Sequence, residues 1–406
     1  MSHDELLVDV RIDALAPGGD AVGRQQGGAN PGRATFVALA APGEQVRARL
    51  TRQKARVAWA ELVAVTSPSP VRATPPCRFF GVCGGCQWQH VELDAQRVAK
   101  RAIVERALPG IPVSLVAPSD TGGGYRDRAR LAVGANGTVG FRARRDHTVV
   151  DIDSCVLLAP GLGPALVALR ALATTWSAGT EIELQLGSDG VHVAIDGPDR
   201  ARTLDAERLL AALRPAGIVG VAVSHSGRRA GATDVDIAEP GSPALRVPAN
   251  GFAQVGRIAN TALVQAVLQA VGPAPGSVLE LYAGSGNFTR HLTGRSPRVV
   301  ACDQDRAAVA RGRVHAPAAS WSLHPPTTGD ADTVLADPPR AGLDPENLAA
   351  VLKARRRFVY VSCDPQTLSR DAARLRAEGF VLRQAVALDL MPHTFHVEVV
   401  ATFDKG

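Results

Sequence analysis

Several features that mark whole classes of protein are missing from this sequence of 406 residues. No apolar run approaches the roughly eighteen residues of a membrane-spanning helix, and the first residues lack the basic, apolar and small-residue order of a secretory signal. There is no block of like charge, no low-complexity tract and no internal repeat, which argues against a disordered chain or a solenoid. We therefore expect a globular, cytoplasmic monomer with no membrane segment and no obligate protein partner.

Cysteine is too scarce and too unevenly placed for a disulfide framework, so each thiol can be considered separately. Cys77, Cys83 and Cys86 lie close together, and the glycines between the last two would let the chain wrap round a metal ion or cluster. With Cys155 as a fourth thiolate, the spacing predicts a metal site. Four thiolates suit both structural zinc and a [4Fe-4S] cluster, and spacing alone leaves both open. Cys302, inside an apolar run, is expected in the core.

The formal net charge of +6 favours a polyanionic partner. In one predicted strand the basic residues recur at nearly alternate positions, which would make one strand face basic, as an oligonucleotide-binding barrel requires. The same spacing fits a solvated edge strand, and both interpretations stay open. The basic residues of this predicted strand and the turn after it are Arg47, Arg49, Arg52, Lys54 and Arg56. Further basic positions, including Lys100 and six arginines between residues 126 and 145, are candidate phosphate contacts.

The pattern of short runs and breaks predicts three domains. Residues 1–66 alternate β-rich runs with Gly and Pro turns, typical of a small barrel, and a proline-rich linker follows. Residues 67–247 form a central domain that opens with a helix over 91–108. Residues 248–406 complete the chain, and from Gly276 onward buried runs alternate with helical stretches, which predicts a doubly wound α/β sheet. The expected strands are 278–281, 298–302, 333–336, 358–362 and 397–403.

A glycine-rich loop follows the first of these strands. Gly284 and Gly286 would let the backbone approach a ligand, and Asp303 ends the next strand, where a carboxylate can accept hydrogen bonds from ribose hydroxyls. A dinucleotide loop would have glycine where Thr289 stands, and no Walker sequence is present. The loop therefore favours S-adenosylmethionine, with a purely structural turn as the alternative.

Two further motifs each follow a predicted strand, Asp337-Pro-Pro-Arg340 and Ser362-Cys-Asp-Pro365. Doubly wound sheets bind ligands at the carboxyl ends of their strands, so both motifs should face the ligand. A thiolate at Cys363 could then attack an electron-poor carbon. For a lone cysteine at a strand end, a buried structural thiol is the commoner arrangement.

Taken together, four motifs in order resemble the S-adenosylmethionine-dependent RNA 5-methyluridine methyltransferases. They are Gly-x-Gly-Asn-Phe at 284–288, Asp-Pro-Pro-Arg at 337–340, Ser-Cys-Asp-Pro-Gln-Thr-Leu-Ser-Arg-Asp at 362–371 and Met-Pro-His-Thr-Phe-His-Val-Glu at 391–398. The resemblance covers essentially the whole chain and implies an amino-terminal TRAM-like (OB-like) barrel, a central, mainly β, iron-sulfur domain that helps to grip RNA, and a Rossmann-like methyltransferase domain.

The chemistry of such enzymes explains why these residues occur together. Carbon-5 of uracil is a poor nucleophile until a thiolate adds at carbon-6, which makes carbon-5 able to take a methyl group. The resemblance gives the thiolate to Cys363 and gives Glu398 the base that removes the carbon-5 proton. The non-catalytic alternative is that Glu398 is a surface carboxylate that faces water.

The resemblance also implies that Gln254, Tyr282, Asp303 and Asp337, with the Gly284 loop, contact the cofactor or the target base. Structural alternatives are a core tyrosine at 282, a loop surface residue at 254 and a turn cap at 337. Gly256 stands where the family usually has a polar residue, and the proline-interrupted stretch 316–329 carries no assigned adenine contact. For Cys77, Cys83, Cys86 and Cys155, the resemblance favours [4Fe-4S] in a structural or RNA-positioning role.

We expect methylation of a uridine in ribosomal RNA, with transfer RNA as the close alternative. One rival, a methyltransferase of exocyclic amines, would usually place an aromatic residue where Arg340 stands and has no use for Cys363. A second rival, a non-catalytic iron-sulfur RNA-binding protein, predicts salt-sensitive RNA binding without binding of a methyl donor.

Overall fold

The computed structural model describes residues 7–27, 30–198, 204–224, 226–239, 242–243, 245–326 and 330–406. The amino-terminal residues through Leu6 and the last part of the 316–329 stretch lie outside the described residues. The chain forms two compact units. Unit 1 comprises Met1–Ile103, Arg142–His147 and Met391–His396, and unit 2 comprises Val104–Phe141, Thr148–Leu390 and Val397–Gly406. Within the described ranges, no helix is both long enough and apolar enough to span a membrane. The finer division into three domains stays a prediction.

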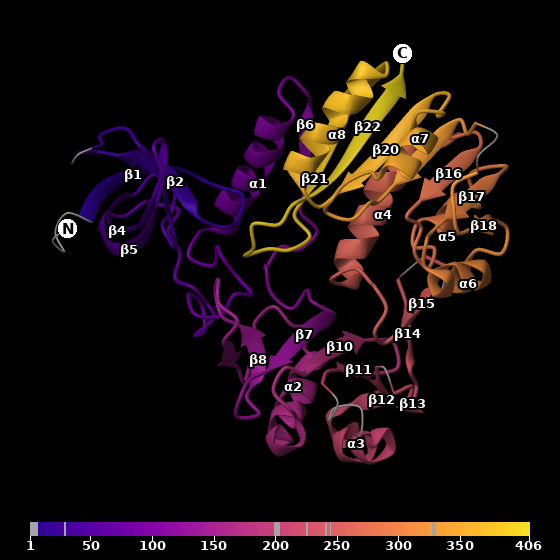
Figure 1. Cartoon of the computed structure of the whole chain (residues 1–406), viewed down its shortest axis with the longest axis horizontal. Helices are drawn as coiled ribbons and strands as arrows, with labels where there is room; N and C mark the ends of the chain where they lie inside the picture. The colour runs from indigo at the N-terminus through magenta and orange to yellow at the C-terminus, as the bar shows by residue number, and fades with distance from the viewer. Residues whose placement is uncertain are drawn as a thin grey trace. The chain divides into compact units, whose positions relative to one another are not determined.

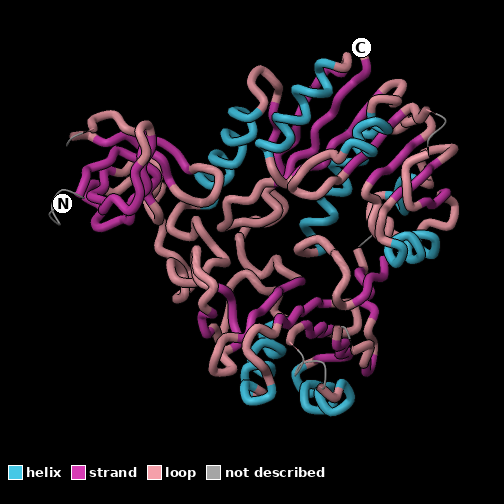
Figure 2. Tube along the Cα trace, in the orientation of Figure 1, coloured by secondary structure: helices cyan, strands magenta, loops and turns pink. Residues whose placement is uncertain are grey.

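Unit 1 opens with a closed five-stranded barrel, which confirms the predicted barrel. Figure 2 shows it as strands and loops. In β4 the small apolar residues point inward and Arg47 and Arg49 point outward, so the expected basic outer face is present. The β pattern of β2 is weak in the sequence, because the strand contains Gly23 and Arg24. The strands, in the order β1-β2-β3-β5-β4, are β1 (Leu7–Leu15), β2 (Ala21–Gln25), β3 (Ala34–Val37), β4 (Gln45–Gln53) and β5 (Val57–Ser67).

The chain after the barrel packs back onto it. Trp88 is fully buried in the barrel's hydrophobic cluster, and its indole N–H donates to the Gly19 carbonyl at 3.1 Å. Helix α1 (Leu93–Ala107) follows, close to its predicted bounds. Lys100 on this helix is fully buried, with Nζ donating to the Met391 carbonyl at 2.9 Å. The expectation that Lys100 contacts phosphate is therefore wrong, because a buried ammonium bound to the protein's own backbone cannot reach RNA.

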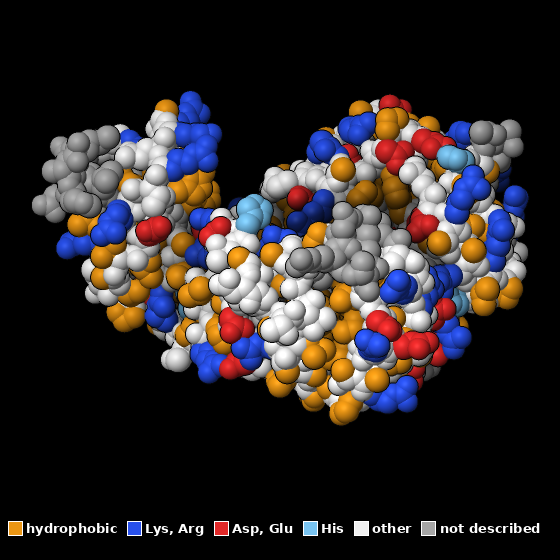
Figure 3. All heavy atoms as spheres, turned by 60° about the horizontal axis from the view of Figure 1, so that its bottom comes forward, with side chains coloured by type: hydrophobic (Ala, Val, Ile, Leu, Met, Phe, Trp, Pro, Cys, Tyr) orange, Lys and Arg blue, Asp and Glu red, His pale blue; other side chains and the backbone are white. Residues whose placement is uncertain are grey.

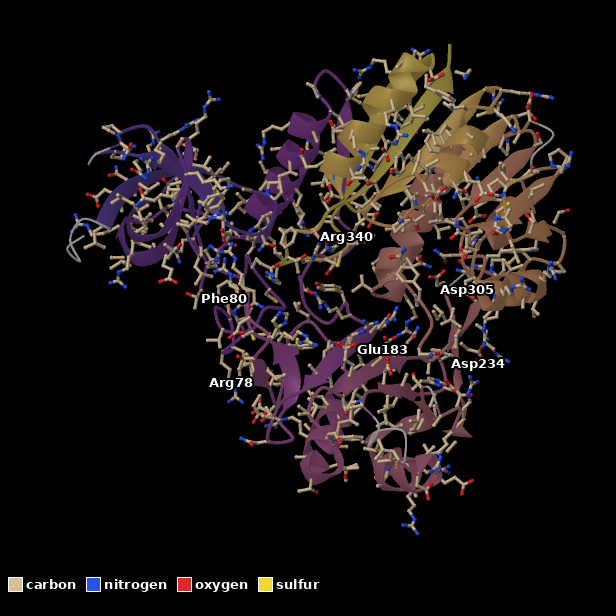
Figure 4. The ribbon with its side chains drawn as sticks, viewed as in Figure 1. Arg78, Phe80, Glu183, Asp234, Asp305 and Arg340 are labelled. Carbon is tan, nitrogen blue, oxygen red and sulfur yellow. The ribbon has the colours of Figure 1, made fainter. Side chains whose placement is uncertain are left out.

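In unit 2 a seven-stranded sheet has the order β13-β12-β11-β10-β7-β8-β9. Arg128 and Arg130 both pair with Glu183, which Figure 4 labels, so these candidate phosphate contacts are already partly neutralised within the fold. The elements are β7 (Arg128–Val133), β8 (Val139–Arg142), β9 (Val149–Asp151), α2 (Leu162–Ala171), β10 (Glu181–Leu186), β11 (Val191–Asp196), α3 (Ala206–Leu213), β12 (Ile218–Val223) and β13 (Arg229–Gly231), followed by the separate hairpin β14 (Asp234–Ile237) and β15 (Leu245–Pro248).

The second sheet of unit 2 has eight strands in the order β18-β17-β16-β19-β20-β22-β21-β6. Neighbours from β18 to β20 pair in parallel, and β22 is antiparallel to both β20 and β21. The five predicted strands are confirmed to within a residue or two. The strands are β6 (Val113–Val116), β16 (Val278–Leu281), β17 (Val299–Cys302), β18 (Ser320–Ser322), β19 (Thr333–Ala336), β20 (Arg357–Ser362), β21 (Phe380–Leu388) and β22 (Glu398–Lys405).

Alternate residues of this sheet face two separate hydrophobic clusters, as a doubly wound sheet requires. Leu281, Ala336 and Tyr360 face the cluster beneath α7 and α8, whereas Val359 and Val361 face the cluster beneath α4. Figure 1 shows α7 and α8 lying across the sheet. Cys302 is buried in the first cluster, which confirms its expected core position. The helices are α4 (Arg257–Val271), α5 (Thr289–Leu292), α6 (Arg306–His315), α7 (Pro345–Val351) and α8 (Pro365–Ala377).

Candidate active site

The strand order places the site at the carboxyl edge of the sheet. From β16 the chain adds β17 and β18 on one side, and β19 and β20 on the other. Ligands of open α/β sheets bind at such a reversal, just beyond the strands' carboxyl ends. The glycine loop follows β16, and the Asp337 segment follows β19, so the two motifs flank the reversal. Figure 4 labels Arg340 at this edge.

The glycine loop is held by Asp303. The Gly284 amide donates to one carboxylate oxygen of Asp303 at 2.8 Å, and the Asp305 amide donates to the other, also at 2.8 Å. Gly284 has φ +54°, a conformation that glycine adopts without strain. The predicted loop and its acidic partner are thus brought together, with Asp303 at the end of β17 as expected.

Tyr282 joins this loop to the start of α7. Its φ is +57°, which is unusual for a residue with a side chain, and its hydroxyl donates to the Asp344 carboxylate at 2.6 Å. Asp344 in turn caps α7 by accepting from the Asn347 amide at 2.9 Å. Burial and Asp344 both raise the pKa of Tyr282, so its hydroxyl stays protonated. Tyr282 also packs against the hydrophobic cluster beneath α7 and α8, so its contact with the cofactor stays a prediction.

Cys363 stands between the end of β20 and the start of α8, and its thiol is half-buried. Burial raises the pKa of the Cys363 thiol, as do the carboxyl groups of Glu398 and Asp337. The Arg340 guanidinium hydrogen bonds the sulfur and lowers this pKa. The structure therefore brings the motifs after β19 and β20 and the residue at the start of β22 into one electrostatic cluster.

Glu398 is the first residue of β22, and only 7% of it is exposed. Burial and the nearby Asp337 raise the pKa of Glu398 well above its usual range. Burial also raises the pKa of Asp337, to about 7. The alternative of a water-facing carboxylate does not hold for Glu398, because its side chain is buried. Two carboxyl groups with raised pKa values beside a thiol suit proton transfer.

Comparison with known proteins identifies the family. Residues 328–405 match the family described as tRNA (Uracil-5-)-methyltransferase. A 23S rRNA (uracil(1939)-C(5))-methyltransferase of Alkalilimnicola ehrlichii is 35% identical, with 92% of each chain covered. One of Chromohalobacter salexigens is 34% identical over 98% of this chain and 89% of that one. This chain belongs to the RNA uracil-C5 methyltransferases.

A solved structure agrees over the whole length. The tRNA (uracil-54, C5)-methyltransferase of Pyrococcus abyssi, in complex with S-adenosyl-L-homocysteine, aligns with a TM-score of 0.73 at 25% identity. The alignment covers 97% of this chain and 99% of that chain. Over the aligned residues, the chain therefore shares the fold of an RNA uracil-C5 methyltransferase.

The strand before the glycine loop carries a buried carboxyl group that no motif predicted. Glu280 lies in β16 and is 1% exposed. One carboxyl oxygen accepts from the Thr289 hydroxyl at 2.6 Å, and the other has no hydrogen-bond partner. Burial raises the pKa of Glu280 to about 8. A lone acidic residue in an otherwise apolar strand was the available signal.

The loop and helix around the predicted Gln254 are also tied to the glycine loop. Gln254 is half-buried in the segment before α4. Within α4, Asn260 exchanges two hydrogen bonds of 2.8 Å with Asn287 of the glycine loop. Sequence reasoning missed this amide pair, because Asn260 sits in a helix with no motif of its own.

The cysteines of the predicted metal site divide between the two units, with Cys77, Cys83 and Cys86 in unit 1 and Cys155 in unit 2. Across the described part of the chain, no three His, Cys, Asp or Glu side chains form a ready metal-binding group. In unit 1, Gln89 Nε2 donates to the Cys86 sulfur at 3.0 Å, and the Gly85 amide donates to the Cys83 sulfur at 3.4 Å. Such N–H donors favour thiolate sulfur, and the [4Fe-4S] assignment stays a proposal.

Proposed function

We propose that this enzyme transfers a methyl group from S-adenosylmethionine to carbon-5 of a uridine in ribosomal RNA. The observation that carries the proposal is the buried Glu398 beside the half-buried Cys363, with Arg340 hydrogen bonded to the thiol. Ribosomal RNA is favoured because the relatives at 34–35% identity are 23S rRNA enzymes, whereas the transfer RNA enzyme is 25% identical. Methylation of a transfer RNA uridine is the alternative.

The first step is addition of Cys363 to the target base. The half-buried thiol gives its proton to solvent, the sulfur forms a bond with carbon-6 of uracil, and the electron pair of the carbon-5–carbon-6 double bond shifts to place the negative charge on the carbon-4 oxygen. Arg340 supports this step because its guanidinium stabilises the thiolate. Burial of the thiol limits the population of thiolate when RNA is not bound, which restrains reaction with other electrophiles.

The second step uses the carbon-5 nucleophile that this addition creates. S-adenosylmethionine supplies the methyl group, which carbon-5 takes as the donor leaves as a neutral thioether. Glu398 in its ionised form then accepts the carbon-5 proton, the carbon-6–sulfur bond breaks, and the Cys363 thiolate is restored. A raised pKa makes the Glu398 carboxylate a stronger base for this proton. General base catalysis of this kind contributes about 10²- to 10⁴-fold.

The methyl donor would be held at the glycine loop. Gly284 would allow its close approach, and Asp303 would accept hydrogen bonds from the ribose. Glu280, in the strand before this loop, adds a buried carboxyl oxygen with no hydrogen-bond partner. Gln254, Tyr282 and Asp337 complete the proposed contacts with the donor and the base.

The cluster assignment is a separate part of the proposal. Cys77, Cys83, Cys86 and Cys155 would hold a [4Fe-4S] cluster in a structural or RNA-positioning role. No redox role is needed, since methyl transfer moves no electrons to an acceptor. The close packing at Gly84 supports a tightly wrapped loop, because a Cβ there would lie 2.9 Å from the Arg142 carbonyl oxygen. Iron and sulfide analysis of anaerobically purified protein decides, and stoichiometric zinc would overturn the assignment.

The remaining parts of the chain would deliver RNA to the site. Residues 1–66 would act as a TRAM barrel, and residues 67–247 as the iron-sulfur and RNA-binding domain before the methyltransferase domain at 248–406. We place the enzyme in the cytoplasm as a monomer, where its RNA is made and processed. The target uridine would leave its stack to reach Cys363.

The test is incubation with labelled methyl donor and total RNA from a strain that lacks the gene. The expected product is labelled 5-methyluridine in ribosomal RNA. Label in transfer RNA would select the alternative, and label on an exocyclic amine would favour the amine methyltransferase. Salt-sensitive RNA binding without any bound donor would identify a non-catalytic RNA-binding protein.

A further inference from the structure

Three side chains form a row on the outer face of the barrel. Phe36, Trp59 and Arg52 occupy registered positions on the neighbouring strands β3, β5 and β4. The rings of Phe36 and Trp59 are stacked, with centroids 5.8 Å apart and planes 16° from parallel. The Arg52 guanidinium lies over the Trp59 ring, 4.9 Å from its centroid. The aromatic rings are half-buried and Arg52 is exposed, so the row forms part of the surface.

The surroundings of this row are basic. Lys54 and Arg56 lie exposed in the turn from β4 to β5, directly before the strand that carries Trp59, and Arg49 is exposed on β4. The exposed carboxylate closest along β5 is Glu61, which is opposite Arg49 in the strand register. In Figure 3, Lys and Arg side chains gather on one side of this barrel. A polyanion is therefore the partner that charge complementarity favours.

Stacked aromatic rings are not expected on a strand face that only contacts water. Aromatic side chains within a basic surface are the means by which proteins bind unpaired nucleic acid, because every base offers a flat face for stacking. An arginine over a tryptophan is held by a cation–π attraction that a base can replace. Once displaced, the same guanidinium is available for a phosphate.

We infer that Trp59 and Phe36 form a stacking site for an unpaired base of the RNA substrate. In the absence of RNA, Arg52 covers Trp59. When RNA binds, the base takes the place of the guanidinium on Trp59, and Arg52 pairs with the adjacent phosphate. The inference rests on the proposed function for its choice of RNA, and it adds a contact remote in sequence from the catalytic motifs.

The chain offers a direct optical test. Of its four tryptophans, Trp88, Trp176 and Trp321 are buried, which leaves Trp59 as the half-exposed one. A single-stranded oligoribonucleotide should quench the tryptophan fluorescence of the full-length protein, and Trp59→Phe should abolish that quench. Inorganic polyphosphate, which has charge but no bases, should bind without quenching. Equal quenching by polyphosphate, or an unchanged quench in Trp59→Phe, would overturn the inference.

Affinity gives a second readout. Trp59→Ala should weaken binding of the oligoribonucleotide about 5-fold or more, as loss of a stacked base does. Arg52→Ala should lower the slope of log affinity against log salt by about one. Val63→Ala, an exposed apolar residue on the same strand, is the matched control and should bind as the wild type does. Wild-type affinity in both test variants would contradict the site. If Trp59→Ala failed to fold, wild-type affinity and an unchanged salt slope in Arg52→Ala would contradict it.

Turnover separates this inference from the proposed function. The Arg52→Ala enzyme should keep the wild-type kcat at saturating RNA and show a raised KM, since the catalytic residues are untouched. Absence of methylation by the wild-type enzyme would defeat the proposed function while the fluorescence test still decides on the stacking site.

Discussion

Gln96 and His393 are joined by two hydrogen bonds across 297 positions of the chain. Gln96 Oε1 accepts from the His393 amide at 2.8 Å, and Gln96 Nε2 lies 3.1 Å from His393 Nδ1. The His393 carbonyl accepts from the amides of Gln87 and Trp88, each at 2.9 Å. His393 has φ +65°, which costs energy in a non-glycine residue and persists only when its surroundings enforce it. This network fixes the loop that leads directly into Glu398.

Gln96→Ala should lower the free energy of unfolding by about 2 kcal/mol, because it leaves buried backbone groups without partners. Urea unfolding of the variant and the wild type measures the difference. Val98→Ala, an exposed position on the same helix, is the control and should change stability by less than about 0.5 kcal/mol. Equal midpoints for Gln96→Ala and wild type would show that the network does not stabilise the fold.

Arg340→Gln should move the rising limb of the kcat/KM–pH profile to higher pH. Burial raises the pKa of Cys363 and Arg340 lowers it, so removal of the guanidinium raises the thiol pKa further. Each unit of that change costs about 10-fold in thiolate, and therefore in rate, below the pKa. The defect should shrink as pH rises. Arg355→Gln removes an exposed arginine that pairs with Asp330, and as the control it should leave the pH profile unchanged. If Arg340→Gln lowered kcat/KM equally at every pH, Arg340 would not act on the thiol pKa.

The raised pKa of Glu280 should make the free energy of unfolding depend on pH. Burial raises the folded-state pKa of Glu280 from 4.5 to about 8. Between these two pH values the folded protein keeps a proton on Glu280 that the unfolded chain has already released. The free energy of unfolding should therefore fall between about pH 4.5 and pH 8, by a few kcal/mol at most. Glu280→Gln cannot ionise and should show a shallower fall in urea titrations across this range. Parallel curves for the two proteins would contradict the assignment.

Glu398→Gln should stall the reaction after methyl transfer. The amide cannot accept the carbon-5 proton, so turnover should fall by about 10²- to 10⁴-fold while RNA remains covalently attached to the protein. A band of protein with RNA that survives denaturing electrophoresis, and that requires methyl donor for its full yield, is the expected result. Loss of turnover with no attached RNA would remove the proposed base role.

Much of the site was predictable because its residues follow strands of a repeating pattern. The five apolar runs after Gly276 located the strands, and the residues just beyond them, including Asp303, Asp337 and Cys363, fall at the carboxyl edge for that reason. The barrel was predictable from turns and alternation, although the weakly patterned β2 was not.

What sequence could not supply depends on contacts between distant residues. The sequence predicts Lys100 to be a surface cation of a basic helix, yet it is buried and donates a hydrogen bond to a carbonyl 291 positions away. In the sequence, Glu398 stands at one end of an ordinary strand, and only its burial in the fold and the neighbouring Asp337 explain why its pKa is raised. The periodicity of a segment carries no information about these partners, since they come from distant segments of the chain.

The most direct test of the account is methylation by Cys363→Ala, measured with labelled donor and RNA from a strain that lacks the gene. Donor binding should remain intact, and formation of labelled 5-methyluridine should fall to background, because without the sulfur carbon-5 of uracil cannot be made nucleophilic. Formation of 5-methyluridine by Cys363→Ala at the wild-type rate would contradict covalent catalysis.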